Sequence, residues 1–581
     1  MRKRTFYKHF VFTLLTFALL FLTGCQNAAQ VSSPTDSDFE AFTEALFQQE
    51  VSANTIGLHY TLENPEDYGI LDAQVTYGSY STSSVESSAA LENCLAALRK
   101  YEGTSLSEEN QLTYDVLEDY LETAMLSAEY TLYDEPLSTL TGVQAQLPIL
   151  LSEFRLENTE DIDIYLTLLS ATEEYFDSLI NFQRTKSDAG LFMSDTNADC
   201  IIEECTSFIG MGKDNYLLSS FEERLDEIDS LTESDRSLYI KKNCELVEAS
   251  VFTAYQNLID AMQELRGTGT NDYGLSYYPN GDKYYEYVVR RETGSSRSIS
   301  ELLQLTETQM LTDLQAIQDV LSENPDAAEV SSQESPLLVE ANPLNILDDL
   351  KTKMSSIFPD NPNVNNTIKY VSEDMQDYVS PAFYIIPAID DTSENVIYIN
   401  QGSTTDGIDL YTTLAHEGYP GHLYQTTYYA GLDTDPLRSA LNFGGYVEGW
   451  ATYAEMCSYY LSPLASDEAA LLQHNASFIL GLYALSDIGI HYQGWTLMDT
   501  VSFFSNYGIT DTDTVTQIYN LIVSDPGNYL KYYIGYLEFL ELKKEAISEW
   551  GDSFTQLRFH EAVLSVGPAS FNVIRNHIFS E

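Results

Sequence analysis

Through most of the chain, apolar residues recur at spacings of three and four, with acidic residues between them. This spacing places the apolar side chains on one face of an α-helix and leaves the charged ones to solvent. The pattern predicts long surface helices over residues 107–133, 159–184, 233–266 and 298–321. Segments rich in Gly, Pro, Asn or Ser interrupt it at residues 267–281 and 324–343. We therefore expect a mainly α fold.

One segment follows a different pattern. Residues 382–400 read AFYIIPAIDDTSENVIYIN, so two runs of β-branched and aromatic residues flank a polar turn. That order is typical of a β-hairpin. The predicted hairpin lies shortly before the histidine motif described below.

The composition bounds the class of protein. Apolar residues make up 44% of the 581 residues, which is enough for a large core and unlike a disordered acidic tail. The 89 acidic and 28 basic residues give a formal net charge of −61. A surface this acidic repels polyanions, so nucleic acid and anionic lipid are not expected as partners. The sequence does not indicate an oligomeric state.

The N-terminus has the features of an export signal. The first eight residues include four basic ones, and the apolar stretch at residues 10–22 is too short to span a bilayer comfortably. It ends in Leu-Thr-Gly-Cys at residues 22–25, which resembles a bacterial lipobox. We expect residues 1–24 to be a signal peptide and Cys25 to be acylated. The alternative is an ordinary cleaved signal peptide with a Cys nearby by chance.

Acylation of Cys25 would anchor the protein at the outer face of the bacterial cell membrane, since several buried acyl chains hold a protein stably. Membrane contact is expected through this anchor only. Residues 25–38 are mostly small and polar, so they are expected to form a flexible tether. The helical domain is then expected over residues 39–581.

Five cysteines follow Cys25, and an odd number in an exported protein argues against a complete disulfide framework. None of them has the Cys-x-x-Cys spacing of a metal site. We expect buried free thiols at Cys94, Cys200, Cys205, Cys244 and Cys457.

The candidate chemistry begins at residues 416–422, which read HEGYPGH. A catalytic zinc site needs imidazole and carboxylate ligands with one position left open. On a regular helix, however, six residues turn roughly 240° around the axis, so His416 and His422 could not meet one ion. Pro420 and Gly421 favour a broken helix, which could bring the two rings together. The spacing alone leaves two interpretations open, a metal site or two structural histidines.

Glu448 is the candidate third ligand. It lies 26 residues after His422, a distance that suits a loop and a second helix packed against the first. Gly, Trp, Ala and Tyr surround it, and a poorly solvated carboxylate needs a metal or another cation. Glu455, two turns further along the same helix, is either a solvated surface acid or a hydrogen-bond partner that fixes the tautomer of a ligating imidazole.

These motifs resemble those of the DUF885 family of bacterial proteins, which are similar to gluzincin metallopeptidases of the oligopeptidase and carboxypeptidase Taq type. The resemblance covers most of the chain after the tether, and it is dense after residue 380. It rests on HEGYPGH (416–422), EGWATYAE (448–455), DIGIHYQGW (487–495), PGNYLKYYIG (526–535) and FHEAVLSVG (559–567). One departure is Asn528, where Gln is usual in the family.

The resemblance implies a two-lobed helical fold with a deep cleft, a catalytic half at about residues 370–577, and a bound Zn²⁺. The hairpin would line the cleft as an edge strand that pairs with an extended peptide. His416, His422 and Glu448 would hold the metal, and Glu417 would be the general base.

The same resemblance leaves the oxyanion donor open among Tyr532, His491 and Tyr533. Asp487 could support His491 from the second layer of contacts, or the two could form a purely structural pair. For a substrate carboxylate, three cations are available, and the sequence does not choose among Arg438, Lys531 and Arg558.

The sequence therefore predicts a zinc metallopeptidase that cleaves short peptides in the cell envelope, with carboxypeptidase or dipeptidyl carboxypeptidase action among the cleavage modes. A metal-dependent amidase acting on a non-peptide amide could use the same residues. A non-catalytic lipoprotein that binds peptides is the alternative from another class, and the presence of Glu417 argues against it.

The anchor can be tested directly. Cys25→Ala removes the acylated thiol, so the protein should leave the membrane fraction or remain as an unprocessed precursor. Fractionation and mass spectrometry of the N-terminus measure both outcomes. Wild-type protein recovered in soluble form with an unmodified N-terminus would contradict the anchor.

Overall fold

The structure is a computed structural model, and it describes residues 34–139, 141–332, 342–360, 364–371, 376, 380–403 and 407–580. The expected signal peptide and Cys25 lie outside the described residues, so the lipid anchor stays a prediction. Among the described residues, no helix has the length and apolar character needed to cross a membrane. Helix α1 (Asp36–Ser52) begins inside the segment expected to be a tether, because Thr35 and Asp38 form a reciprocal capping box.

The chain is mainly helical, as its periodicity predicts. The N-terminal part of the chain continues with α2 (Thr55–Thr61), α3 (Ser84–Leu98), α4 (Glu108–Met125), α5 (Val143–Ser152), α6 (Thr159–Asp188), α7 (Asp195–Gly210) and α8 (Tyr216–Asp226). It is followed by α9 (Glu233–Leu246), α10 (Phe252–Leu265), α11 (Gly281–Thr293), α12 (Ile299–Glu323), α13 (Ala328–Ser332) and α14 (Pro343–Met354).

The C-terminal part carries the motif-rich sequence. It contains α15 (Ile408–Glu417), α16 (His422–Ala430), α17 (Pro436–Ala440), α18 (Gly444–Leu461) and α19 (Ser466–His491). The remaining helices are α20 (Leu497–Ser505), α21 (Thr512–Ser524), α22 (Asn528–Trp550), α23 (Gln556–Val566) and α24 (Phe571–Ile578).

The four long helices predicted from the sequence are present, with two differences. The segment at 107–133 ends its helix at Met125, and turns follow as far as a short 3₁₀ helix at Thr131–Tyr133. The segment at 233–266 contains one π-helical turn, Val247–Val251, between α9 and α10. The break at 267–281 is confirmed, whereas the one at 324–343 still holds α13, and residues 333–341 lie outside the described part.

The predicted hairpin is confirmed. Strand β2 (Ala382–Ile385) pairs antiparallel with β3 (Glu394–Ile399), in a register that sets Ala382 opposite Ile399. A third strand, β1 (Asn365–Tyr370), pairs parallel with β3, so the sheet order is β1-β3-β2. The sequence pattern does not predict β1, because NNTIKY is polar and largely exposed and lacks the apolar alternation of a half-buried strand. Strand β2 is therefore an edge of the sheet.

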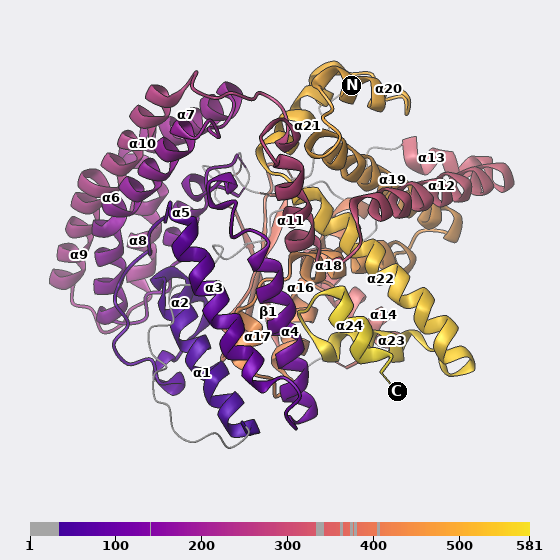
Figure 1. Cartoon of the computed structure of the whole chain (residues 1–581), viewed down its shortest axis with the longest axis horizontal. Coiled ribbons are helices and arrows are strands. Elements are labelled where there is room, and N and C mark those ends of the chain that lie inside the picture. Colours follow the sequence, from indigo (N-terminus) through magenta and orange to yellow (C-terminus); the bar gives the residue numbers. More distant parts are fainter. Residues whose placement is uncertain are drawn as a thin grey trace.

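The side chains form two large cores. Helices α5 to α10 pack around one of them, and Figure 1 shows α6 to α10 gathered on one side of the molecule. The other core joins α1, α3 and α4 to α11, to the sheet, and to the helices from α14 to α18 and α22 to α24. The cysteines of the described residues are free thiols, as expected; Cys94 and Cys205 are buried, and the other three are half-buried.

Helices α18 and α22 lie in backbone contact at the centre of the second core. A Cβ atom built on Gly535 would lie 2.8 Å from the Cα of Gly449 and would overlap the main-chain oxygen of Gly445. Gly449 and Gly535 thus let the two helices approach more closely than any side chain would allow, while Gly445 leaves room for the main chain of Thr293 in α11. Glu448 and Tyr532 are placed on these helices beside that contact.

Gly535→Ala should therefore destabilise the protein. The new methyl group meets backbone atoms of α18 rather than a movable side chain, so we expect a loss of about 1–3 kcal/mol in the free energy of unfolding. Urea unfolding measures it. Gly210→Ala in α7 is the control, since a Cβ atom at that position would have no other group within 4 Å; there we expect a gain of roughly 0.5–1 kcal/mol. Equal effects at the two positions would contradict the close contact.

Candidate metal centre

The helix that carries the first histidine breaks directly after it. Helix α15 ends at Glu417 and α16 begins at His422, so the two histidines lie on different helices. A Cβ atom on Gly421 would overlap the main-chain oxygens of Ala415 and His416. Only glycine lets the chain fold back this tightly. The indole N–H of Trp450 in α18 donates to the main-chain oxygen of Pro420 at 2.8 Å and holds the break in place.

This break brings the three expected ligands together. His416, His422 and Glu448 each offer a ligand atom, and these atoms all lie within 4.8 Å of one another. Glu448 Oε2 is 3.7 Å from His416 Nε2 and 3.4 Å from His422 Nε2. The two imidazole rings are nearly perpendicular, at 81°. The regular helix that would have separated them is not formed.

The polar atoms of this cluster do not satisfy one another by hydrogen bonding, and their positions suit the binding of a cation. His422 Nε2 and both carboxylate oxygens of Glu448 are buried, and none makes a hydrogen bond within the described part of the chain. Leaving such groups unpaired in a core costs free energy, so each of them needs a partner. Two imidazole nitrogens and one carboxylate oxygen are a donor set that zinc takes in catalytic sites, with a position left open.

Glu455 lies against the outer nitrogen of the first ligand. Its Oε2 is 3.1 Å from His416 Nδ1. A proton on Nδ1 would be donated to this carboxylate, which leaves the lone pair of Nε2 directed at the cluster. Of the two interpretations open in the sequence, this geometry favours the tautomer-fixing partner over a surface acid.

The pKa values reflect an excess of carboxylates. Burial lowers the pKa of His416, but the Glu448 and Glu455 carboxylates raise it more, to about 10. Burial raises the pKa of Glu417 to about 8; the charge of His416 opposes the shift and that of Glu448 adds to it. The pocket thus holds more negative charge than it can solvate, a condition that a divalent cation relieves.

Glu417 is held by the edge strand of the sheet. The main-chain N–H of Tyr384 in β2 donates to Glu417 Oε2 at 3.0 Å. Oε1 makes no hydrogen bond to any described residue and remains available for a proton. Because β2 is an edge strand, one of its main-chain sides is not paired with another strand, and the N–H of Tyr384 on that side is directed at α15.

Tyr532 faces the metal cluster, whereas Tyr533 faces another helix. The Tyr532 ring centroid lies 6.3 Å from that of His416, and the residue is buried. Burial and then the charge of Glu448 raise the pKa of Tyr532 well above its usual value, so its hydroxyl stays protonated and can donate. The Tyr533 hydroxyl lies instead against Gly481 in α19. The geometry therefore favours Tyr532 as the donor.

His491 has both ring nitrogens occupied by main-chain groups. Nδ1 accepts the N–H of Leu275 at 3.1 Å, and Nε2 lies 2.8 Å from the oxygen of Ile522. No ring N–H is left for an oxyanion, so the catalytic role expected for His491 is not favoured by the structure. The motif spacing could not reveal this, because it does not tell where the ring nitrogens point.

Asp487 supports a turn rather than an imidazole. Its carboxylate accepts the N–H of Gly527 at 3.0 and 3.1 Å and the hydroxyl of Tyr285 at 2.6 Å. Gly527 adopts a left-handed conformation, with φ of 80°, at the start of α22. Asp487 and His491 thus fix α21 and the first turn of α22, four residues before Tyr532. Asp487 and His491 therefore make no hydrogen bond to each other, although both alternatives considered for Asp487 from the sequence, support of His491 and a structural pair with it, assume that contact.

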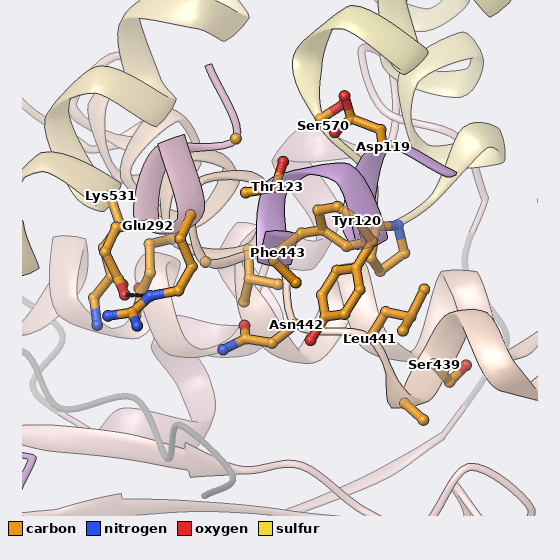
Figure 2. Close-up of a pocket in the computed structure, with 18 of the residues that line it drawn as sticks. Asp119, Tyr120, Thr123, Glu292, Ser439, Leu441, Asn442, Phe443, Lys531 and Ser570 are labelled. Carbon is orange, nitrogen blue, oxygen red and sulfur yellow. Dashed lines mark hydrogen bonds and ion pairs between the residues drawn. The ribbon is translucent and has the colours of Figure 1, made fainter. Parts of the chain in front are cut away.

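The metal cluster borders a cavity of about 650 Å³. Glu448 lies on its wall, together with residues of α4, α11, α16 and the segment that leads into α18. Figure 2 shows how Tyr120, Glu292, Phe443 and Lys531 surround the space. The residues from α4 and α11 could not be found from the sequence, because their motifs lie far from HEGYPGH and carry no metal-binding spacing.

Comparison with known proteins identifies the family to which the chain belongs. The family model described as "Bacterial protein of unknown function (DUF885)" matches residues 66–578. The chain is therefore a member of the DUF885 family, as its motifs predict. No curated protein matches the sequence. Similarity to gluzincin metallopeptidases does not emerge from these comparisons, so it stays an expectation.

Two solved structures are similar in fold. One is a protein from Colwellia psychrerythraea described as a candidate lipoprotein, with 20% sequence identity and a TM-score of 0.80; the match covers 94% of this chain and 98% of that one. The other is a candidate lipoprotein of unknown function from Shewanella oneidensis, with 15% identity, a TM-score of 0.60, and coverage of 94% and 99%. At these identities the likeness shows the fold alone.

The pKa of the turn-supporting carboxyl can be tested through stability. Burial raises the pKa of Asp487 to about 7 from its usual 3.8. Between these values the folded protein holds a proton that the unfolded chain releases, so this group makes stability fall as pH rises from about 4 to 7. Asp487→Asn keeps an acceptor for Gly527 and does not titrate, so its stability should fall less over that range.

Urea unfolding at pH 4.5 and 7.5 measures the difference. Asp72→Asn, at an exposed position, matches the change in net charge and serves as the control. Parallel pH dependence in wild type and Asp487→Asn would overturn the raised pKa.

Proposed function

We propose that this protein is a zinc-dependent peptidase that cleaves short peptides in the cell envelope. The observation that carries the proposal is the convergence of His416, His422 and Glu448 on one buried point, with Glu417 directly after the first of them. A binding protein needs no carboxylate at that position, whereas a hydrolase needs a base beside the ion.

The residues divide the work of hydrolysis. His416, His422 and Glu448 would hold the zinc ion, which would supply Lewis acidity for a water molecule and for the scissile carbonyl. Glu417 accepts the proton of the attacking water at Oε1 and returns it to the leaving amine. Oε2 of Glu417 keeps its hydrogen bond from the main-chain N–H of Tyr384, which holds the carboxylate in one orientation. The Tyr532 hydroxyl donates a hydrogen bond to the oxyanion that develops on the carbonyl.

The cavity and the edge strand support a peptide as substrate. A cavity of about 650 Å³ is within the range of sites that hold small ligands, and it suits a short peptide better than a folded protein. Strand β2 has one side that pairs with no other strand, and although the N–H of Tyr384 there is taken by Glu417, an extended peptide could pair with the remaining main-chain groups. We propose that this cavity is the substrate cleft of a two-lobed, metallopeptidase-like fold.

The cellular location is part of the proposal. Cys25 follows a lipobox-like sequence, and two proteins of similar fold are described as candidate lipoproteins. We propose that acylation of Cys25 holds the catalytic domain at the outer face of the membrane.

Two substitutions separate metal binding from catalysis. Glu417→Gln should keep zinc, because Glu417 is not among the converging ligands, but its amide cannot accept a proton. We expect hydrolysis to fall by roughly 10²- to 10⁴-fold. Glu448→Gln should lower the zinc content, since a charged ligand becomes neutral. Zinc per chain and cleavage of a mixed peptide library, followed by mass spectrometry, measure both effects.

Glu561→Gln, on the exposed face of α23, is the matched control and should change neither quantity. Near-normal turnover in Glu417→Gln would exclude this mechanism. Zinc binding by the wild type without cleavage of any peptide would favour a non-peptide amidase or a binding protein instead.

A further inference from the structure

One basic side chain at the cavity, Lys531, forms no ion pair with a carboxylate of the described residues. Lys531 is 5% exposed and lines the same cavity as Glu448; Figure 2 shows it at one end of the lining, beside Glu292. No described carboxylate lies within 4.0 Å of its amine, and the amine donates no hydrogen bond to a described residue. The amine lies 5.6 Å from the centroid of the Tyr532 ring.

The other basic side chains at the cavity are already paired. Arg290 lies 3.1 Å from Asp119, and Arg291 lies 2.8 Å from Glu292. Lys531 therefore differs from its neighbours in having no carboxylate within 4.0 Å, although its charge lowers the pKa of Asp525 and of Glu448 from further away. Burying an ammonium group in this way costs free energy unless an anion joins it, so the position favours a ligand that carries a negative charge.

The structure also decides among the three cations that the sequence left open. Arg438 is fully buried, donates to the main-chain oxygen of Val566 and does not line the cavity. Arg558 lies over the ring of Trp550 at 4.2 Å and does not line the cavity. Lys531 alone of the three shares the cavity with Glu448.

Lys531 lies about one helical turn from the metal cluster. Its Cδ atom is 3.6 Å from the position of a Cβ atom on Gly444, which is four residues before Glu448 in α18. Four residues of helix rise about 6 Å, and an extended peptide advances about 3.3 Å per residue. A group bound by Lys531 is therefore within about two residues of a bond held at the cluster.

We infer that Lys531 binds a carboxylate of the substrate, one or two residues from the bond that is cleaved. This inference rests on the proposed peptidase function and adds the substrate class. The carboxylate has two sources. A free C-terminus would make the protein a peptidase that removes one or two residues from the end of a chain, and an acidic side chain would make it select Asp or Glu near the cleaved bond.

Three forms of one peptide distinguish these sources. The first ends in a free carboxylate, the second in an amide, and the third in an amide with Glu within two residues of the cleaved bond. We expect wild type to favour a carboxylate-bearing form over the plain amide by roughly 10- to 100-fold in kcat/KM, as for a hydrogen bond to a charged group. Lys531→Met should reduce this ratio toward one, and Lys531→Arg should retain most of it.

Lys544→Met is the control on the same helix, since that side chain is exposed and pairs with Glu541; it should leave the ratio unchanged. A ratio retained in Lys531→Met, or no carboxylate preference in wild type, would overturn the inference. Preference for the free C-terminus or for the Glu-containing amide identifies the source.

A binding measurement keeps the inference separate from the proposed function. Glu417→Gln loaded with zinc should bind the carboxylate-bearing peptide more tightly than the plain amide in calorimetry, and the added Lys531→Met change should remove the difference. If this difference is found while wild type cleaves nothing, the peptidase proposal fails and the Lys531 site stands. If cleavage occurs without any difference in binding, the peptidase proposal stands and the Lys531 site fails.

Discussion

The backbone contact between α18 and α22 is the constraint on which the candidate site depends. Gly449 and Gly535 face each other at the crossing and carry no side chain, so the two helices meet main chain to main chain there. Glu448 precedes one of these glycines by a single residue, and Tyr532 precedes another by three. If the helices stood further apart, the third ligand of the cluster and its candidate hydrogen-bond donor would separate. The distance between Glu448 and Tyr532 therefore depends on the close contact between the backbones of α18 and α22.

Around this contact, each functional side chain is held by a group from a different part of the chain. Glu455 orients His416, the edge strand orients Glu417, and Asp487 fixes the turn that starts α22. All of these partners are hydrogen-bond acceptors or main-chain donors in buried surroundings, where such bonds define one geometry. The position of each group is thus decided before any ligand arrives, which is what a preorganised site requires.

Much of this arrangement could be predicted from the sequence, and the exceptions have physical causes. The long helices could be predicted because apolar residues recur there at spacings of three and four, with acidic residues between them. The polar turn between two β-rich runs located the hairpin. The sequence left open whether His416 and His422 approach each other. Their approach depends on a tight backbone turn at Gly421, and residue spacing alone does not predict such a turn. His491 remained a candidate oxyanion donor in the sequence, because a motif gives the position of a histidine in the chain but not the hydrogen-bond partners of its ring nitrogens. Lys531 needed the structure, because burial and the absence of a near carboxylate among described residues are properties of packing.

The acidic exterior has a consequence for how quickly such a site fills. With 89 acidic side chains and 28 basic ones, the molecule surrounds itself with a negative potential, and Lys531 lies beneath it in the cavity. An anionic peptide approaching from solution is first repelled and meets the attractive charge only at short range. At physiological ionic strength the repulsion decays over roughly 8 Å, whereas in dilute salt it reaches further. The rate of capture would then rise with salt, which is the opposite of electrostatic steering, while the dwell time of a captured ligand would be governed by the buried contacts.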